Sequence, residues 1–368
     1  MQAPAPRTLI ADDYSISQII VGAWQLSEGH TPDRPEREAV FEAFGRMVDA
    51  GLTTFDCADI YTGVEELLGE FRRWRLSDRA GASSGEPPEA THGKPAEVPS
   101  PIQIHTKLVP DRNALASIDR AYVERIIDRS LKRLGVDQLD LVQLAWWDYT
   151  VPRYVEAACW LAELQKAGKI RHIGATNFDT PRLAEIVEAG VRIVAHQVQY
   201  SLLDHRPENG MAELCREQDI HLLCYGSLAG GFLTDRWVGA EEPQEPLPNR
   251  SLTKYKLIID EFGGWTLFQE LLATLRDIAD RHGVGIGAAA IRYVLDRPQV
   301  AAAIVGARND KYLQENLDAF SLQLDQEDTD RLEEVVAKRS GSVGDTYDLE
   351  RVPGSSHAVI MRYDLNRG

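Results

Sequence analysis

The chain alternates eight times between a short apolar run and a segment of helical periodicity. The expected strands are nearly continuous in apolar residues, which is typical of strands buried on both faces of a parallel sheet. They fall at 19–21, 52–56, 102–107, 139–144, 170–174, 193–198, 220–224 and 302–305. The helical patterns follow at 35–50, 63–74, 119–134, 152–167, 180–189, 209–217, 266–282 with 286–296, and from Asn309. Eight such units favour an α/β fold of the closed (β/α)8 TIM-barrel type.

An open, doubly wound sheet is the alternative for such an alternation. It would place a glycine-rich GxGxxG turn directly after the first strand, where the chain instead has Gly22-Ala23-Trp24-Gln25. We therefore expect a single barrel domain over residues 1–368. Residues 7–17 are expected to form an N-terminal hairpin that plugs the barrel floor, and residues 325–338 to add a C-terminal helix.

Three segments lie outside the regular alternation. Residues 77–101 are rich in Ser, Gly, Pro, Glu and Ala and precede a strand. They therefore predict a flexible insertion on the side of the barrel away from its mouth. Residues 226–265 form a long connection that follows a strand end. The C-terminal tail 339–368, rich in Gly, Ser and Arg, either folds over the mouth or lies loose.

Composition and charge restrict the class of protein. With 43% hydrophobic and 26% charged residues, the chain is expected to be globular. A net charge of −17 and a pI of about 5.0 disfavour binding to nucleic acid or to acidic membranes. The chain has no apolar run of about 18 residues and no signal-like start, which predicts a cytoplasmic protein. No metal site is expected from the spacing of the cysteines, and Cys57, Cys159 and Cys224 are predicted to be reduced core thiols.

One strand end and the loop after it carry the clearest catalytic chemistry. Asp56 stands at the expected end of its strand, and Tyr61 follows in the loop, where side chains face the mouth of a barrel. A phenol has an ordinary pKa near ~10, so proton exchange at neutral pH needs a nearby cation to stabilise the phenolate. Lys107, at the end of the next strand, is the candidate cation, and Asp56 is the carboxylate to hold it. Taken singly, these residues could be a cap, a packed ring and a solvated ammonium.

Further motifs occur in order along the chain at the spacing of barrel strands. Together they resemble the aldo-keto reductase superfamily over nearly the whole chain, from about Ile19 to Leu324. The resemblance implies a (β/α)8 barrel that binds NADP(H) in an extended pose without a Rossmann domain, and that acts on a small molecule. The matching stretches are Gly-Leu-Thr-Thr-Phe-Asp-Cys-Ala-Asp-Ile-Tyr at 51–61, His-Thr-Lys at 105–107, Leu-Asp-Leu-Val-Gln-Leu at 139–144, Gly-Lys-Ile-Arg-His-Ile-Gly-Ala-Thr-Asn-Phe at 168–178, Gln-Val-Gln-Tyr-Ser-Leu-Leu at 197–203, Tyr-Gly-Ser-Leu-Ala-Gly-Gly-Phe-Leu-Thr at 225–234, and Val-Gly-Ala-Arg at 305–308 with Glu315-Asn316.

The resemblance also implies the residues of an active site. Tyr61 would be the general acid, Lys107 would lower the pKa of its phenol, and Asp56 would hold Lys107. The substrate pocket would comprise Trp24, Tyr61, Ala145, Trp146 and Trp147. The residues that contact the cofactor would be Gly22, Trp24, Asp56, Thr176, Asn177, Gln197, Tyr225, Gly226, Ser227, Leu228, Gly231, Gly306, Arg308, Tyr312, Glu315 and Asn316.

Several of these residues have the chemistry that nicotinamide recognition needs. Thr176, Asn177 and Gln197 offer a hydroxyl and amides to a flat carboxamide, and Tyr225 offers a ring face for stacking. The small residues after Tyr225 let backbone amides approach a pyrophosphate. The connection 226–265 would then close over the cofactor as a clasp. The alternatives are polar turn residues and a core tyrosine.

A second set would receive the adenosine end. Gly306 and Arg308 lead into a helix expected at Asn309, and a helix start beside an arginine is an anion site. In the family this place receives the 2′-phosphate, which favours NADPH over NADH. Glu315 and Asn316 would meet the adenine, and the alternative for them is a solvated helix face.

The chain departs from the family at one catalytic position. The family has a histidine directly after the strand written here as Leu-Val-Gln-Leu, and this chain has Ala145. A methyl group cannot orient a substrate oxygen or share its proton. Three explanations are open: a substrate whose own groups fill the space, such as an imine or a conjugated C=C bond; a loss of reductase chemistry; or an introduced substitution.

The leading hypothesis is an NADPH-dependent oxidoreductase that acts on a bulky, largely apolar carbonyl, imine or conjugated C=C compound. A second hypothesis is an NADPH-binding sensor or scaffold without turnover, which loss of the histidine would permit. A third is a non-redox lyase or cyclase that uses Tyr61 and the tryptophan walls. The oligomeric state does not follow from the sequence.

Overall fold

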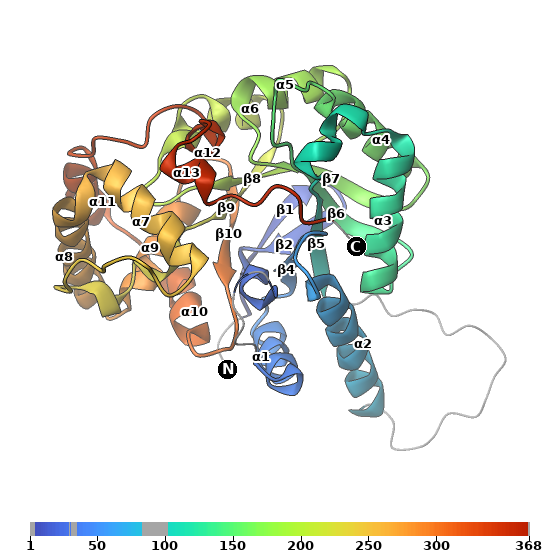
Figure 1. The fold of residues 1–368 in the computed structure, drawn as a ribbon. Coiled ribbons are helices and arrows are strands. Elements are labelled where there is room, and N and C mark those ends of the chain that lie inside the picture. Colours follow the sequence, from blue (N-terminus) through green and yellow to red (C-terminus); the bar gives the residue numbers. More distant parts are fainter. Residues whose placement is uncertain (1–3, 29, 31–34, 83–101, 367–368) are drawn as a thin grey trace.

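The computed structural model describes residues 4–28, 30, 35–82 and 102–366, and among these the eight expected strands close into a parallel barrel (Figure 1). The strand order is β10-β3-β4-β5-β6-β7-β8-β9, so each strand pairs with its sequence neighbours and the last pairs with the first. The fold prediction is therefore confirmed. The strands are β3 (Ile19–Gly22), β4 (Thr54–Asp56), β5 (Gln103–Leu108), β6 (Leu139–Leu144), β7 (Ile170–Thr176), β8 (Ala195–Gln199), β9 (His221–Tyr225) and β10 (Val300–Gly306).

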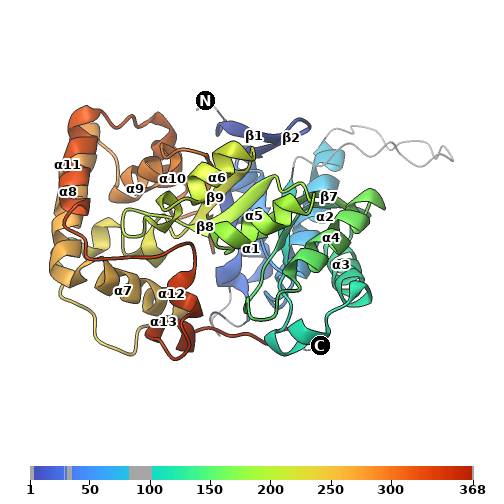
Figure 2. The same ribbon diagram turned by 90° about the horizontal axis from the view of Figure 1, so that it is seen from above.

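Helices surround the barrel (Figure 1), and the turned view shows them on both sides of it (Figure 2). Helix α3 illustrates why they form: Asp119 caps its start by accepting from Tyr122 N at 2.7 Å, and Gly135 ends it in the left-handed conformation with φ of 67°. The helices are α1 (Arg37–Asp49), α2 (Val64–Ala82), α3 (Arg120–Leu134), α4 (Tyr154–Lys166), α5 (Thr180–Glu188), α6 (Met211–Glu217), α7 (Arg250–Phe262), α8 (Gly264–His282), α9 (Ile286–Leu295), α10 (Leu313–Ser321), α11 (Gln326–Val336), α12 (Asp348–Arg351) and α13 (Ser356–Val359).

The N-terminal hairpin is also confirmed, with β1 (Arg7–Ala11) antiparallel to β2 (Tyr14–Ser17). Its apolar side chains Ile10, Tyr14 and Ile16 are buried in a cluster with residues of the barrel interior. The hydroxyl of Tyr14 lies 3.1 Å from Nε2 of the buried His105. The hairpin therefore closes the end of the barrel opposite to the carboxyl ends of the strands.

The structure corrects three expected boundaries. Helix α2 continues to Ala82, into the segment 77–101 that was predicted to be a flexible insertion, and residues 83–101 lie outside the described residues. The connection 226–265 contains helix α7. Helix α10 begins at Leu313 rather than Asn309, because Oδ1 of Asn309 accepts from Lys311 N at 3.1 Å and forms a local turn.

The C-terminal segment after α11 folds over the barrel mouth, one of the two predicted alternatives. We call residues 339–366 the strap. It carries α12 and α13 across the carboxyl ends of the strands and ends beside the loop after β5 (Figure 1). In the part of the chain that the structure describes, no helix combines the length and the apolar character needed to cross a membrane.

Candidate active site

A cavity of ≈1080 Å³ opens at the carboxyl ends of the barrel strands. Its floor is made by strand ends, one side by the segment that includes α7, and another side by the strap. Of the predicted site residues, all of which the structure describes, Ser227 alone does not line this cavity; it is buried, and its Oγ has no hydrogen-bond partner. The structure thus brings the other predicted residues together around one space.

Asp56 and Lys107 form a buried ion pair at the floor. Asp56 is the last residue of β4, and Lys107 lies on the neighbouring strand β5. Nζ of Lys107 donates to both carboxylate oxygens of Asp56, at 2.9 and 2.7 Å, and to the carbonyl oxygen of Cys57 at 2.8 Å. Burial alone would lower the pKa of Lys107, but the charge of Asp56, the charge of Tyr61 and the hydrogen bond to Asp56 together outweigh it and raise the pKa above its usual value. Lys107 is therefore a permanent cation at neutral pH.

Tyr61 lies beside this pair, and its ring centroid is 5.2 Å from Nζ of Lys107. Burial raises the pKa of Tyr61 to about 12, and the charge of Lys107 offsets this increase only in part. Lys107 thus acts on the pKa of Tyr61 in the expected direction, but burial keeps that pKa above its ordinary value. The physical reason is that a phenolate loses more solvation on burial than one nearby cation restores.

Two amide side chains donate to Asp56, and a third, that of Asn177, accepts from Tyr225. Gln197, on β8, donates its Nε2 to Oδ1 of Asp56 at 2.6 Å, so its side chain supports the ion pair. Gln143, on β6, adds a second donor at 3.2 Å, which the sequence analysis did not identify. Thr176 ends β7 and lines the cavity. The Oδ1 of Asn177 accepts from the hydroxyl of Tyr225 at 2.8 Å.

Tyr225 ends β9 and presents its ring to the cavity. Nζ of Lys254, on α7, lies 5.0 Å from the centroid of that ring. The same ammonium lies 5.5 Å from the ring centroid of Tyr347 on the strap. One cation therefore joins the barrel, α7 and the strap at the cavity wall. Stacking of nicotinamide on Tyr225 stays a prediction.

Several arginines line the cavity. Arg308 lies in the loop after β10 and not at a helix start, because α10 begins only at Leu313. Arg236 and Arg250 line the same cavity. Glu315, on α10, accepts from Gly287 N at the start of α9 at 3.1 Å. In a chain of net charge −17, this gathering of guanidinium groups makes the cavity a local site for an anion.

The aromatic residues have different roles. Trp24 packs against Tyr61 with ring centroids 4.8 Å apart. Trp147 is half-buried; its indole donates to Pro110 O at 2.8 Å, and its ring contacts Tyr363 of the strap at 5.2 Å. The indole of Trp146 is buried and donates to backbone carbonyls, which makes it mainly a packing residue.

Ala145 follows β6 directly and lines the cavity with only a methyl group. Of the other histidines, His30 lies at the cavity rim, where its Nε2 is 3.1 Å from Oγ of Ser251 on α7. Burial, and then the charges of Arg308 and Arg250, lower the pKa of His30. It is a neutral contact between the first barrel loop and α7, and its position does not replace the missing imidazole after β6.

Sequence reasoning placed the connection 226–265 over the cofactor and allowed the tail to fold over the mouth, but it identified neither α7 nor the residues of these segments that line the cavity. Helix α7 could have been sought, because the apolar residues Leu252, Tyr255, Ile259 and Phe262 have helical spacing. The strap carries no comparable signal. The cavity residues that these segments add include Arg250, Ser251, Lys254, Tyr255, Tyr347, Ile360, Met361 and Arg362.

Comparisons with known proteins agree with this architecture. A family model described as "Aldo/keto reductase family" matches residues 18–337. Aldo-keto reductase yakc (NADP+) of Schizosaccharomyces pombe is 30% identical over 55% of this chain and 58% of its own length. NADH-specific methylglyoxal reductase of Escherichia coli is 26% identical over 62% of this chain and 68% of its own. The thermostable aldo-keto reductase Tm1743, solved with epalrestat, is 25% identical with a TM-score of 0.66, covering 89% of this chain and 98% of that one.

Several curated relatives are longer than the region they share with this chain. The match spans 51% to 65% of their length. What those whole proteins do therefore bears on this chain only through the residues of its own cavity.

Proposed function

The chain belongs to the aldo/keto reductase family, and from this premise we propose that it is an NADPH-dependent reductase. It transfers hydride to a carbonyl, imine or conjugated C=C bond of a bulky, largely apolar small molecule, with Tyr61 as proton donor. The observation that carries the proposal is the buried Asp56–Lys107 pair beside Tyr61, at the floor of a large cavity lined by aromatic residues and several arginines.

The residues present fit a nicotinamide dinucleotide. Both Tyr61 and Arg308 line the cavity, and ≈1080 Å³ is enough for a large ligand. Gly231, which also lines it, keeps the backbone approachable, because no atom lies within 4 Å of where its Cβ would stand. Asn177 places a side-chain amide at the wall for a carboxamide. Arg308 supports the choice of NADPH over NADH, since a guanidinium can bind a phosphate through two hydrogen bonds.

When bound, the cofactor supplies a hydride. The chain's own residues then handle the proton. With a pKa of about 12, Tyr61 is protonated at neutral pH and can donate to a substrate oxygen or nitrogen. Lys107 stabilises the phenolate that remains, and Asp56 keeps Lys107 in place. The strap and α7 cover the cavity and exclude water, which strengthens these charge interactions.

Ala145 leaves the site without an imidazole after β6. Without an imidazole after β6, no second side chain on that strand donates to the substrate oxygen, so Tyr61 carries the proton transfer. The space beside the methyl group favours a substrate with bulk at the reacting centre. The same observation supports the second candidate, a protein that binds NADPH and senses it without turnover.

The test is steady-state oxidation of NADPH by the purified chain on a panel of aromatic aldehydes, ketones, imines and conjugated enones. Tyr61→Phe is the matched variant, because it removes only the hydroxyl. We expect turnover on some members of the panel, and a loss of ~10²–10⁴-fold in kcat for Tyr61→Phe with an unchanged Kd for NADPH. Tight NADPH binding without turnover on the whole panel would contradict the reductase proposal and favour the NADPH sensor.

A further inference from the structure

The strap is attached to successive loops around the barrel mouth. Near its start, Oδ2 of Asp345 accepts from Thr180 N at 2.7 Å, at the first turn of α5. Near its end, Asn366 donates its backbone N–H to Asp111 at 2.8 Å and its Nδ2 to Asp59 at 3.0 Å. Asp59 lies in the loop between Asp56 and Tyr61. The strap is therefore a built part of the site rather than a loose tail.

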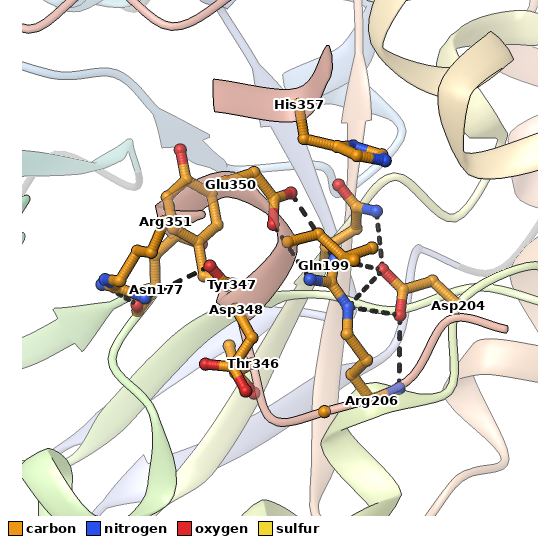
Figure 3. A network of polar contacts seen from close by, with 12 residues as sticks. Asn177, Gln199, Asp204, Arg206, Thr346, Tyr347, Asp348, Glu350, Arg351 and His357 are labelled. Atoms are coloured by element: carbon orange, nitrogen blue, oxygen red, sulfur yellow. Dashed lines mark hydrogen bonds and ion pairs between the residues drawn. The ribbon is translucent and has the colours of Figure 1, made fainter. Parts of the chain in front are cut away.

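Helix α12 carries the buried ion pair of this attachment, through Glu350 (Figure 3). Glu350 pairs with Arg206 at 2.9 Å and with Lys254 at 3.5 Å. Arg206 also pairs with Asp204 at 2.7 Å, and Gln199 donates to Asp204 at 2.6 Å. Burial would raise the pKa of Glu350, but the two cations hold it at about 2. Glu350 is thus charged at any physiological pH and fixes α12 against the barrel.

The next residue, Arg351, reaches across two barrel loops (Figure 3). Its Nη2 donates to the carbonyl oxygen of Trp146 at 3.0 Å, after β6, and to that of Asn177 at 2.7 Å, after β7. The guanidinium lies 4.2 Å from the ring centroid of Tyr149 and 5.1 Å from that of Tyr347. The two rings hold it in one plane, so its donors are directed at these carbonyls.

Asn177 needs such support because its backbone is unusual. Its φ is 60°, in the left-handed region that costs a residue other than glycine about 1–3 kcal/mol. Its N–H donates to Gln197 O at 3.0 Å, its carbonyl accepts from Arg351, and its Oδ1 accepts from Tyr225. Among the described residues, these contacts leave Nδ2 as the donor that Asn177 offers to the cavity it lines.

We propose that Arg351 is a positioning residue for nicotinamide: by holding the carbonyl of Asn177, it fixes the left-handed backbone and aims Nδ2 at the oxygen of the carboxamide. Arg351 thereby controls how the reactive end of the cofactor is oriented, although Arg351 itself does not line the cavity. This inference rests on the proposed function, because it requires that a nicotinamide dinucleotide binds in this cavity.

The test measures binding rather than turnover. Isothermal titration gives the Kd of NADP+, which carries the carboxamide, and of adenosine 2′,5′-bisphosphate, which lacks the nicotinamide half. We expect Arg351→Ala to raise the Kd of NADP+ about tenfold, the worth of one net hydrogen bond, and to leave the Kd of the bisphosphate within about twofold. Arg339→Ala is the control, because Arg339 also lies on the strap but does not line this cavity, and its guanidinium donates to Val336 O of α11.

A double-mutant cycle with Asn177→Gly tests whether Arg351 affects the Kd of NADP+ through Asn177. Glycine adopts a φ of 60° freely, so this variant removes the amide and the need for support together. We expect the double variant Arg351→Ala/Asn177→Gly to match Asn177→Gly within about twofold, because two residues that act through one contact are not additive. Arg351→Gln, which is too short to reach both carbonyls, carries the same test if Arg351→Ala does not fold.

Each result has a definite meaning. Equal loss of affinity for NADP+ and the bisphosphate, or additive losses in the cycle, would overturn the positioning role and make Arg351 a structural residue. An unchanged Kd for NADP+ in Arg351→Ala or Arg351→Gln would overturn it as well. Wild-type protein that binds neither compound would instead refute the proposed function, which separates the two failures.

Discussion

Replacement of Lys107 by Met tests the ion pair at the centre of the site. The thioether has a similar length but no charge, so Asp56 would keep only the amides of Gln143 at 3.2 Å and Gln197 at 2.6 Å. In the wild type the side chains of Lys107 and Asp56 are 5% and 7% exposed. Water can therefore do little to replace the lost ammonium.

The magnitude follows from two independent limits. Breaking a buried ion pair by removing one partner costs about 3–5 kcal/mol of unfolding free energy. The unpaired carboxylate can instead take up a proton. For a carboxyl group of ordinary pKa, protonation at pH 7 costs a free energy of ~4 kcal/mol. We therefore expect Lys107→Met to lose ~3–4 kcal/mol at pH 7. At pH 5 protonation costs only ~1.4 kcal/mol, so the loss should shrink as the pH falls.

The assay is urea unfolding followed by tryptophan fluorescence at both pH values. With an m value of about 3 kcal/mol/M, the expected loss moves the midpoint at pH 7 by about 1 M. Lys107→Met/Asp56→Asn is the matched control, since it removes both charges and should recover most of the midpoint while lacking reductase activity. A midpoint for Lys107→Met within about 0.3 M of the wild type at pH 7, or equal losses at both pH values, would refute the reasoning.

Three further predictions concern the cofactor and the chemistry. Arg308→Ala should weaken NADPH by ~1.5–3 kcal/mol and leave NADH nearly unchanged in fluorescence titrations; equal weakening of both would tell against a 2′-phosphate contact. Since the pKa of Tyr61 is about 12, the phenol stays protonated from pH 6 to 9. Its contribution to kcat for reduction should be flat there, while oxidation, which needs the phenolate, should rise about tenfold per pH unit. Ala145→His should raise reduction of simple aromatic aldehydes by up to ~10²–10⁴-fold; no gain on any aldehyde, with NADPH binding intact, would favour the sensor.

The sequence predicted the barrel and most of the cavity residues because their signals are local. Apolar runs such as Leu139 to Leu144 predict a buried strand. In a closed parallel barrel the residues at the carboxyl ends of the strands all lie at the same mouth, so their proximity follows from the fold. The start of α10 was misplaced because Asn309 has the chemistry of a helix cap but forms an isolated turn. The effect of burial on the pKa of Tyr61 could not be predicted, because the degree of burial is a property of the folded cavity and not of the motif.

The position of the strap over the mouth could be predicted only as one of two alternatives, for a different reason. Glu350 and Arg206 are 144 positions apart, and neither lies in a pattern that names the other as partner. A segment rich in Gly, Ser and Arg has the same composition whether it is loose or docked. Only the folded barrel supplies the carbonyls and carboxylates that such a tail can bind, so its role appears first in the structure.

Two features distinguish this site from a simple barrel site, Ala145 and the strap, and they meet at the loop after β6. Ala145, where an imidazole is absent, is followed directly by Trp146, whose carbonyl accepts from Arg351 of the strap at 3.0 Å. Arg351 of the strap, which lies outside the barrel, therefore fixes the loop that follows Ala145. A histidine placed at position 145 would stand on a loop that Arg351 holds through the carbonyl of Trp146, so the loop cannot simply move back to make room. Ala145→His should therefore gain less activity in the intact chain than when combined with Arg351→Gln, if the binding of NADPH is matched by raising its concentration. A larger gain in the single variant would show that the strap does not limit this space.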